Sequence, residues 1–271
     1  MNPITPATKS GYAPVNGLQL YYEVRGTGGT PLVVLHGGLH NTAMDAPVAA
    51  RLAEHRQVIS VDLQGHGRTA DIARPLRHEQ LADDVAALLG SLGVDRADVL
   101  GYSLGGGVAV RMAIQHPERV RKLVVVGAPF SSAGWYPEVS IGFQHLGHAL
   151  AEMMRPSPNF QTYAAIAPDP AQFGTLLDKT GELNTRSFDW SADVAKLAMP
   201  VLLVFADADA ISPSHVVHYY ELLGGGKRDA GLDGSGRSAA SLAILPGHTH
   251  YDMFESPALI AAVVPFLDAR R

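Results

Sequence analysis

The sequence lacks cysteine altogether, and this absence excludes several kinds of site. None of the 271 residues can form a disulfide, give a thiolate to a metal or act as a cysteine nucleophile. Charged residues are few, at 17%, and the formal net charge is −5. Because proteins that bind nucleic acid usually present a basic face, we do not expect nucleic acid as a partner. A chain without cysteine fits a reducing compartment, so we expect a cytoplasmic protein.

Long apolar runs are absent as well. The longest ones, 123–130 and 259–267, are too short to cross a bilayer, so no membrane partner is expected. Residues 1–9 are polar and do not have the apolar core of a signal peptide. With 46% apolar residues the chain can nevertheless form a sizeable core, as one large domain or two smaller ones. The sequence does not indicate an oligomeric state.

Short apolar runs alternate with segments of helical period along most of the chain. The runs 12–15 and 18–24 flank Asn16-Gly17, a pair that favours a two-residue turn and therefore an antiparallel hairpin. The later runs are apolar without interruption, which is typical of strands buried on both faces by helices. These runs are 31–35, 58–61, 99–101, 123–127, 201–205 and 242–245.

Apolar residues spaced three or four apart predict helices between these runs, for example over 81–92 and 108–114. Ser256-Pro257 has the residue types of a helix start and predicts a last helix to residue 269. We therefore predict an α/β fold, with a mostly parallel central sheet of about eight strands and helices on both faces.

One long interval, 130–199, contains no run of strand length. Helical stretches are expected around 141–154 and 171–183. Since connections of this length are rare unless they have a function, we interpret the interval as a helical lid inserted into the domain. The core is then formed by residues 1–129 and 200–271.

The strongest chemical signal is the sequence from Gly101 to Gly105, which reads Gly-Tyr-Ser-Leu-Gly. It lies between a predicted strand and a predicted helix, which is the position of a nucleophile elbow. Small residues on both sides of the serine relieve the crowding of such a sharp turn. The pattern therefore indicates that Ser103 is a nucleophile, rather than part of an ordinary glycine-rich turn.

A serine nucleophile needs a histidine base that is oriented by an acid, and in this kind of fold the chain order is serine, acid, histidine. Downstream of Ser103, one predicted strand is followed by Asp207 and Asp209, and the next by His248 and His250. Both sets follow strands, at the sheet edge where open α/β proteins have their sites. Order and location agree, but the residues alone leave either aspartate and either histidine open.

At this point the chain resembles a known family, the α/β-hydrolase superfamily, and in particular its lid-bearing serine esterases and cofactor-free haloperoxidases. The resemblance extends over nearly the whole chain. It rests on the following motifs: His36-Gly37-Gly38, Asp62 to Arg68, Gly101 to Gly107, His116 to Val120, Asp209 with Pro213, and His250 with Glu255.

The resemblance implies which residues act. The spacing to Pro213 selects Asp209 over Asp207, and the spacing to Glu255 selects His250 over His248, which is then a loop residue that contacts backbone. Asp207 is expected to cap the helix that follows it.

The family pattern also assigns the oxyanion hole to the backbone N–H groups of Leu104 and Gly38, with Leu39 as the fallback donor. His36 and His66 are expected to brace loops. No cofactor is required.

One further pattern, His248-Thr249-His250-Tyr251-Asp252, has part of the spacing of a metal-hydrolase ligand set. Position 253 is Met, where that set has a further histidine, so we expect no metal.

The pocket is expected between the elbow and the lid. Its predicted lining comprises Leu39, Tyr102, Phe130, Trp135 and Tyr136, with Phe143, Phe160 and Trp190 as further candidates.

The sequence thus predicts a carboxylesterase for small to medium apolar esters that acts through an acyl-enzyme. Lactones such as acyl homoserine lactones, or bulky xenobiotic esters, would be cleaved by the same machinery. A ligand-binding or receptor-type member of the fold, a perhydrolase and a carbon–carbon bond hydrolase are the alternatives.

Overall fold

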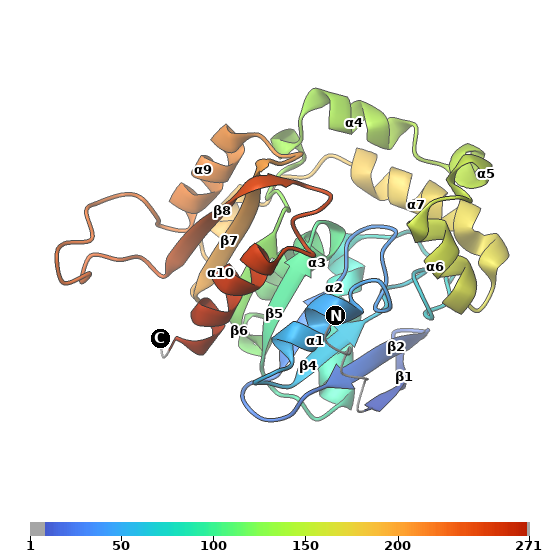
Figure 1. Ribbon diagram of the computed structural model, residues 1–271, viewed down its shortest axis with the longest axis horizontal. Coiled ribbons are helices and arrows are strands. Elements are labelled where there is room, and N and C mark those ends of the chain that lie inside the picture. The colour runs from blue at the N-terminus through green and yellow to red at the C-terminus, as the bar shows by residue number, and fades with distance from the viewer. Residues whose placement is uncertain (1–8, 270–271) are drawn as a thin grey trace.

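The computed structural model describes residues 9–269, and its centre is one sheet of eight strands in the order β1-β2-β4-β3-β5-β6-β7-β8 (Figure 1). β1 pairs with β2, and β2 with β4, in antiparallel fashion, and the other neighbours are parallel. The prediction of a mostly parallel sheet of about eight strands is confirmed. The strands are β1 Lys9–Val15, β2 Leu18–Arg25, β3 Leu32–Leu35, β4 Val58–Val61, β5 Ala97–Tyr102, β6 Val120–Val126, β7 Val201–Ala208 and β8 Ala240–Thr249.

The antiparallel hairpin forms where the sequence predicts it. Asn16 and Gly17 both have positive φ, at 48° and 85°, as a tight turn between twisted strands requires. The turn brings Val15 opposite Leu18, and both side chains are buried.

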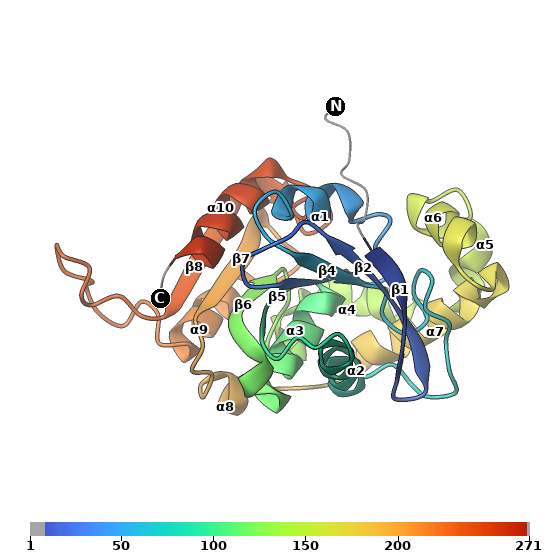
Figure 2. The same ribbon diagram turned by 90° about the horizontal axis from the view of Figure 1, so that it is seen from below.

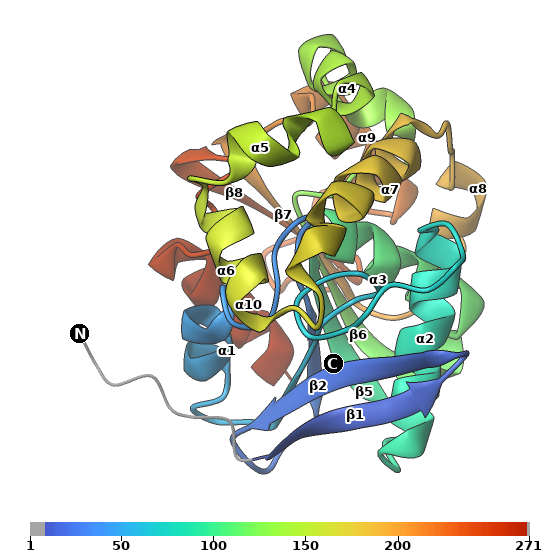
Figure 3. The ribbon, with the colours of Figure 1, turned by 90° about the vertical axis from the view of Figure 1, so that its right-hand side faces the viewer.

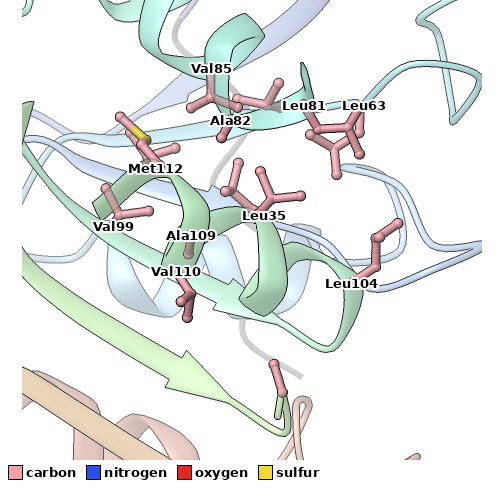
Figure 4. Close-up of a cluster of buried hydrophobic side chains, with 14 of the residues drawn as sticks. Leu35, Leu63, Leu81, Ala82, Val85, Val99, Leu104, Ala109, Val110 and Met112 are labelled. Atoms are coloured by element: carbon pink, nitrogen blue, oxygen red, sulfur yellow. The ribbon is translucent and has the colours of Figure 1, made fainter. Parts of the chain in front are cut away.

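Helices cover both faces of the sheet (Figure 2). α1 (Ala46–Leu52) and α10 (Pro257–Asp268) lie on one face, and α2 (His78–Ser91), α3 (Leu104–Gln115) and α9 (Pro213–Leu222) lie on the other. A short 3₁₀ helix, η1 (Pro117–Arg119), links α3 to β6. Each face has its own cluster of buried apolar side chains, and Figure 4 shows part of the cluster between the sheet and the helices α2 and α3.

The 130–199 segment connects β6 to β7 and contains helices but, within the named elements, no strand. Figures 1 and 3 show its helices α4, α5, α6 and α7 over the end of the sheet at which α3 begins. Its elements are η2 Ser132–Gly134, α4 Pro137–Gln144, η3 His148–Leu150, α5 Ala151–Met154, α6 Pro158–Ile166, η4 Pro170–Gln172, α7 Phe173–Thr185 and α8 Ser191–Val194.

Two details of this segment differ from the sequence prediction. The helix expected around 141–154 is not continuous, because Gly147 is fully extended at φ −176° and separates α4 from η3. α6 was not predicted, although Ser157 caps it by accepting a hydrogen bond from the N–H of Phe160.

Ionic contacts hold α7 against the core. The Lys179 ammonium donates to an Asp71 carboxylate oxygen at 2.5 Å and to the carbonyl oxygens of Ile72 and Arg74 at 2.8 Å. Three residues further along α7, Glu182 pairs with Arg77 at 2.8 Å, directly before α2 begins. α7 is therefore fixed to both the 71–74 loop and the start of α2.

Over residues 9–269, no helix is both long enough and apolar enough to cross a membrane.

Candidate active site

Ser103 lies at a sharp turn between β5 and α3. Its backbone has φ 51° and ψ −114°, a conformation that is strained for any residue other than glycine. The glycines two positions away make the turn possible: a Cβ at Gly101 would lie 2.0 Å from the carbonyl oxygen of Gly105, and one at Gly105 would lie 2.3 Å from that of Leu35. The local structure is the elbow that the motif predicts.

Three of the predicted side chains form one hydrogen-bonded chain. His250 Nε2 lies 3.0 Å from Ser103 Oγ, and His250 Nδ1 lies 2.9 Å from Asp209 Oδ1. Each of the three residues directly follows a strand, namely β5, β7 and β8. Since these strands are parallel, their carboxyl ends meet at one edge of the sheet, and this brings together residues up to 147 positions apart.

Further contacts orient the acid and the histidine. The second carboxylate oxygen of Asp209 accepts a hydrogen bond from the N–H of Ala206 at 3.0 Å. The Tyr102 hydroxyl donates to the carbonyl oxygen of His250 at 2.6 Å, and the Tyr102 ring stacks on Phe254. Asp209 and His250 are 9% and 6% exposed, so the pair is shielded from water. A chain of this kind can transfer the serine proton to the imidazole while the carboxylate stabilises the resulting charge.

The rival residues have other partners. Both carboxylate oxygens of Asp207 accept hydrogen bonds from the N–H of Gly247, and one also accepts from that of His248. The Gly247 bond is the main reason why the pKa of Asp207 lies below its usual value. The prediction that Asp207 caps the next helix is wrong, because Ser212 accepts the capping hydrogen bond of α9. His248 contacts backbone, as predicted, with Nδ1 2.9 Å from the carbonyl oxygen of Pro246, but it lies within β8 and not in a loop.

His36 and His66 brace loops, as the resemblance implied. His36 Nε2 accepts a hydrogen bond from the N–H of Leu63, and Nδ1 donates to the carbonyl oxygen of Gly37. His66 Nδ1 lies 2.9 Å from the carbonyl oxygen of Gln64. Burial lowers the pKa of both imidazoles, that of His66 to about 4.

The side chains of the apparent metal pattern point to different partners. His250 faces Asp209 and Ser103, whereas Asp252 accepts hydrogen bonds from the backbone N–H and the hydroxyl of Thr249. Within residues 9–269 no group of three or more metal-binding side chains comes together.

The two residues predicted to donate the oxyanion hydrogen bonds, Gly38 and Leu104, both lie close to Ser103 in the structure and line the same cavity. Leu104 is the first residue of α3, where N–H groups have no partner inside the helix. Gly38 lies beside it, since a Cβ at Gly38 would be 3.9 Å from that of Leu104. Among the described residues, neither of these N–H groups donates to a side chain or to a backbone carbonyl in a loop or turn. Leu39, the fallback donor, has a positive φ of 62°.

A cavity of about 370 Å³ opens at the serine. Leu39, Tyr102, Trp135 and Phe143 line it, as predicted. The remaining lining residues are Gly37, Gly38, His40, His78, Ser103, Leu104, Gly107, Ala128, Pro129, Val139, Leu146, Asn159, Thr180, Leu183, Asn184, Phe188, Ala210, His250 and Tyr251.

The sequence prediction is wrong for part of this lining. Phe130 is buried in the core instead, where its ring stacks on His215 at 4.0 Å and meets Tyr219 edge-on. Tyr136 precedes α4 and does not reach the cavity.

Two further candidates, Phe160 and Trp190, do not line the cavity either. Phe160 packs on Phe173, and Trp190 packs behind Phe188.

Several polar lining residues were missed. His40 follows the His36-Gly37-Gly38 motif, and its Nδ1 lies 3.2 Å from an Asp45 carboxylate oxygen. His78, Asn159, Thr180 and Asn184 come from α2, α6 and α7, and no local motif distinguishes them.

The fold and the site together define an α/β hydrolase with a serine–histidine–aspartate arrangement. A family model described as alpha/beta hydrolase fold matches residues 30–152. The chain is also 31% identical over 218 residues to a pimeloyl-acyl-carrier-protein methyl ester esterase from Pectobacterium carotovorum. The alignment covers 73% of this chain and 83% of that protein. The chain therefore belongs to the α/β-hydrolase superfamily, and esterases are among its relatives.

Solved structures agree on the fold. A carboxylesterase from Bacillus subtilis is 21% identical, with a TM-score of 0.73 over 98% of this chain and 93% of that one. An enol-lactonase from Burkholderia xenovorans is 24% identical, with a TM-score of 0.70 over 95% of this chain and all of that one.

Proposed function

We propose that this hydrolase cleaves carboxylic esters of small to medium size through an acyl-enzyme formed on Ser103. One observation carries the proposal: Ser103, His250 and Asp209 are linked by hydrogen bonds of 3.0 and 2.9 Å at the base of a cavity. A binding protein that only holds its ligand has no need of this relay. The sequence relationship to a methyl ester esterase supports the same reaction.

The reaction follows from the positions of the proton carriers. His250 Nε2 accepts the Ser103 proton while Oγ attacks the ester carbonyl carbon, and Asp209 stabilises the imidazolium through Nδ1. The N–H groups of Gly38 and Leu104 stabilise the negative oxygen of the tetrahedral intermediate. His250 then gives the proton to the departing alkoxide. In the second half, water loses a proton to His250 and attacks the acyl carbon, and Ser103 regains a proton as the acid leaves.

We assign the role of a lid to the 130–199 segment. Six residues of α4, α6 and α7 line the cavity, among them Val139, Asn159 and Leu183. A cover of this kind excludes water from the acyl-enzyme until the alcohol has left. The core would then comprise 1–129 and 200–271.

A panel of p-nitrophenyl and alkyl esters tests the proposal. The wild type should hydrolyse short to medium esters and be labelled by a fluorophosphonate probe, and Ser103→Ala should lose both properties. His250→Ala should reduce turnover by roughly 10³-fold or more, while His248→Ala, the matched control two residues earlier, should change it little. A wild-type protein that neither turns over any ester nor reacts with the probe would indicate a ligand-binding member of the fold instead.

Lactones are cyclic esters and belong in the same panel. An N-acyl homoserine lactone and a simple δ-lactone compare ring opening with cleavage of an open ester of equal carbon number. If lactones exceed the matched open esters in kcat/KM, the esterase assignment is replaced by that of a lactonase with the same three residues.

A further inference from the structure

The cavity is lined by apolar and by polar but uncharged residue types. Among its described lining residues there is no aspartate, glutamate, lysine or arginine. A charged group of a substrate would therefore lose its hydration there without gaining an ion pair, which is strongly unfavourable. The lining nevertheless contains polar side chains besides those of the triad, and three of them lack partners.

Thr180 on α7 is the first of these. Its side chain lines the cavity but is only 2% exposed, and its hydroxyl oxygen Oγ1 has no hydrogen-bond partner. Its methyl carbon Cγ2 lies 3.7 Å from the position of a Cβ at Gly38, so Thr180 adjoins the proposed oxyanion loop. A buried hydroxyl without a partner costs about 1–3 kcal/mol, and a ligand that supplies a partner would recover this free energy.

Asn184 lies one turn further along α7 and lines the same cavity. Within the described chain no hydrogen bond involves its side-chain amide, whereas the amide of Asn159, also in the lining, is already bonded to the carbonyl oxygen of Leu39. Asn184 can both donate and accept.

His78 is the first residue of α2 and also lines the cavity. Its ring packs on Phe188 and Trp190, and a Cβ at Gly107 would lie 2.6 Å from it, so it adjoins the first turn of α3. Among residues 9–269 neither ring nitrogen has a hydrogen-bond partner, in contrast to His40, which is held by Asp45. Burial lowers the pKa of His78 to about 4, so at neutral pH the ring is uncharged, with one donor and one acceptor nitrogen.

An ion pair links α7, which carries Thr180 and Asn184, to the start of α2, which carries His78. Arg77, next to His78, pairs with Glu182, which lies between Thr180 and Asn184 on α7. We propose that His78, Thr180 and Asn184 form a polar subsite that binds an uncharged hydrogen-bonding group of the substrate, such as a hydroxyl or an amide. This inference rests on the esterase function proposed above. The preferred substrates are then neutral functionalised esters, and neither plain alkyl esters nor esters with a carboxylate in the chain.

Matched esters test the subsite. On the acyl side, p-nitrophenyl 6-hydroxyhexanoate is compared with p-nitrophenyl heptanoate, which has the same number of heavy atoms, and with mono-p-nitrophenyl adipate, which carries a carboxylate. On the alcohol side, the monobutanoate of 1,4-butanediol is compared with pentyl butanoate. In one of the two series the hydroxyl ester should exceed its methyl counterpart by about tenfold in kcat/KM, and the adipate should be the poorest acyl substrate.

Isosteric variants connect the preference to the subsite. Thr180→Val and Asn184→Leu remove hydrogen bonding at nearly constant volume, and each should abolish most of the preference for the hydroxyl ester, measured as the ratio of its kcat/KM to that of the methyl ester. Thr185→Val is the matched control, because its hydroxyl bonds the carbonyl oxygens of Gly181 and Glu182 outside the cavity. Thermal melting of each variant shows whether it is folded. If one of the two variants does not fold, the other still tests the subsite.

The outcomes separate the two proposals. If plain esters are hydrolysed in a Ser103-dependent manner but neither series prefers the hydroxyl ester, the subsite is refuted and the esterase function stands. The subsite is refuted in the same way if a preference exists but survives both Thr180→Val and Asn184→Leu. If no ester is hydrolysed and the fluorophosphonate does not react, the esterase function and the subsite are refuted together.

Discussion

The side-chain amide of Asn159 donates a hydrogen bond to the carbonyl oxygen of Leu39, 3.2 Å away. Asn159 belongs to α6 in the 130–199 segment, and Leu39 directly follows Gly38. Leu39 has a positive φ of 62°, which is unfavourable for a leucine. The bond thus holds a strained residue in the loop to which we assign an oxyanion donor.

From this contact we predict that Asn159→Ala lowers kcat by roughly three- to tenfold with little change in KM, because the Gly38 N–H would be less well positioned for the transition state. Steady-state kinetics on a p-nitrophenyl ester measure both constants. Gln161→Ala, in the same helix but exposed, is the control and should leave both unchanged. A rise in KM at constant kcat would instead assign Asn159 to ground-state binding.

The two aspartates at the carboxyl end of β7 should differ clearly in their effect on activity. Asp209→Asn keeps the shape but removes the charge to which we assign stabilisation of the His250 imidazolium, so kcat/KM should fall by roughly 10²–10⁴-fold. Asp207→Asn should keep most of the activity, since the Asp207 carboxylate bonds backbone N–H groups of Gly247 and His248 and not His250. Measured kcat/KM values for both variants decide the assignment, and it is reversed if Asp207→Asn is the inactive one.

Two glycines in helices should respond to alanine in opposite ways. Gly105→Ala introduces a Cβ that would lie 2.3 Å from the carbonyl oxygen of Leu35, so the protein should be severely destabilised or fail to fold. Gly142→Ala in α4 has open space around the new methyl group and should raise the free energy of unfolding by about 0.5–1 kcal/mol. Urea denaturation followed by circular dichroism measures both. Equal effects of the two changes would contradict the close approach of α3 to β3.

Buried His66 should make stability depend on pH. Its pKa in the folded state is lowered to about 4, chiefly by burial, while the unfolded chain keeps a value near ~6.5. The unfolded chain therefore binds more protons between these values, and stability is lost as the pH falls from about 6.5 to 4.

Melting temperatures over this range should fall more steeply for the wild type than for His66→Asn, whose amide can keep the hydrogen bond to the Gln64 carbonyl. Summed over the range from about pH 6.5 to 4, the expected difference between the two proteins in the loss of unfolding free energy is on the order of 3 kcal/mol. His55→Asn, at an exposed position, should retain the wild-type slope. Parallel curves for all three proteins would show that His66 does not carry the effect.

The parts of this molecule that follow from local sequence were predictable. The uninterrupted apolar runs form strands because a parallel sheet is buried on both faces. The elbow was predictable from Gly101 and Gly105, where a Cβ would clash with backbone atoms. That an aspartate near the end of β7 meets a histidine near the end of β8 could be predicted, since parallel strands end at a common edge, and the family spacing then selected Asp209 and His250.

What could not be predicted depends on contacts distant in sequence. An aromatic residue such as Phe130 suits a pocket as well as a core, and only its packing on His215 and Tyr219 from α9 decides between them. Likewise, nothing near His78 in the sequence signals that it will line the same cavity as residues of α7. The lining of the cavity is a property of how the 130–199 segment docks, which the sequence pattern does not encode locally.

The backbone of Ser103 has a broader consequence for how this protein can be altered. At φ 51° and ψ −114° the position suits glycine better than any other residue. Ser103→Gly would therefore relieve a strain of about 1–3 kcal/mol while removing the hydroxyl on which the proposed reaction depends. Selection for thermal stability alone would favour glycine at position 103 and so an inactive protein. Engineering for stability therefore has to include an activity screen at every round.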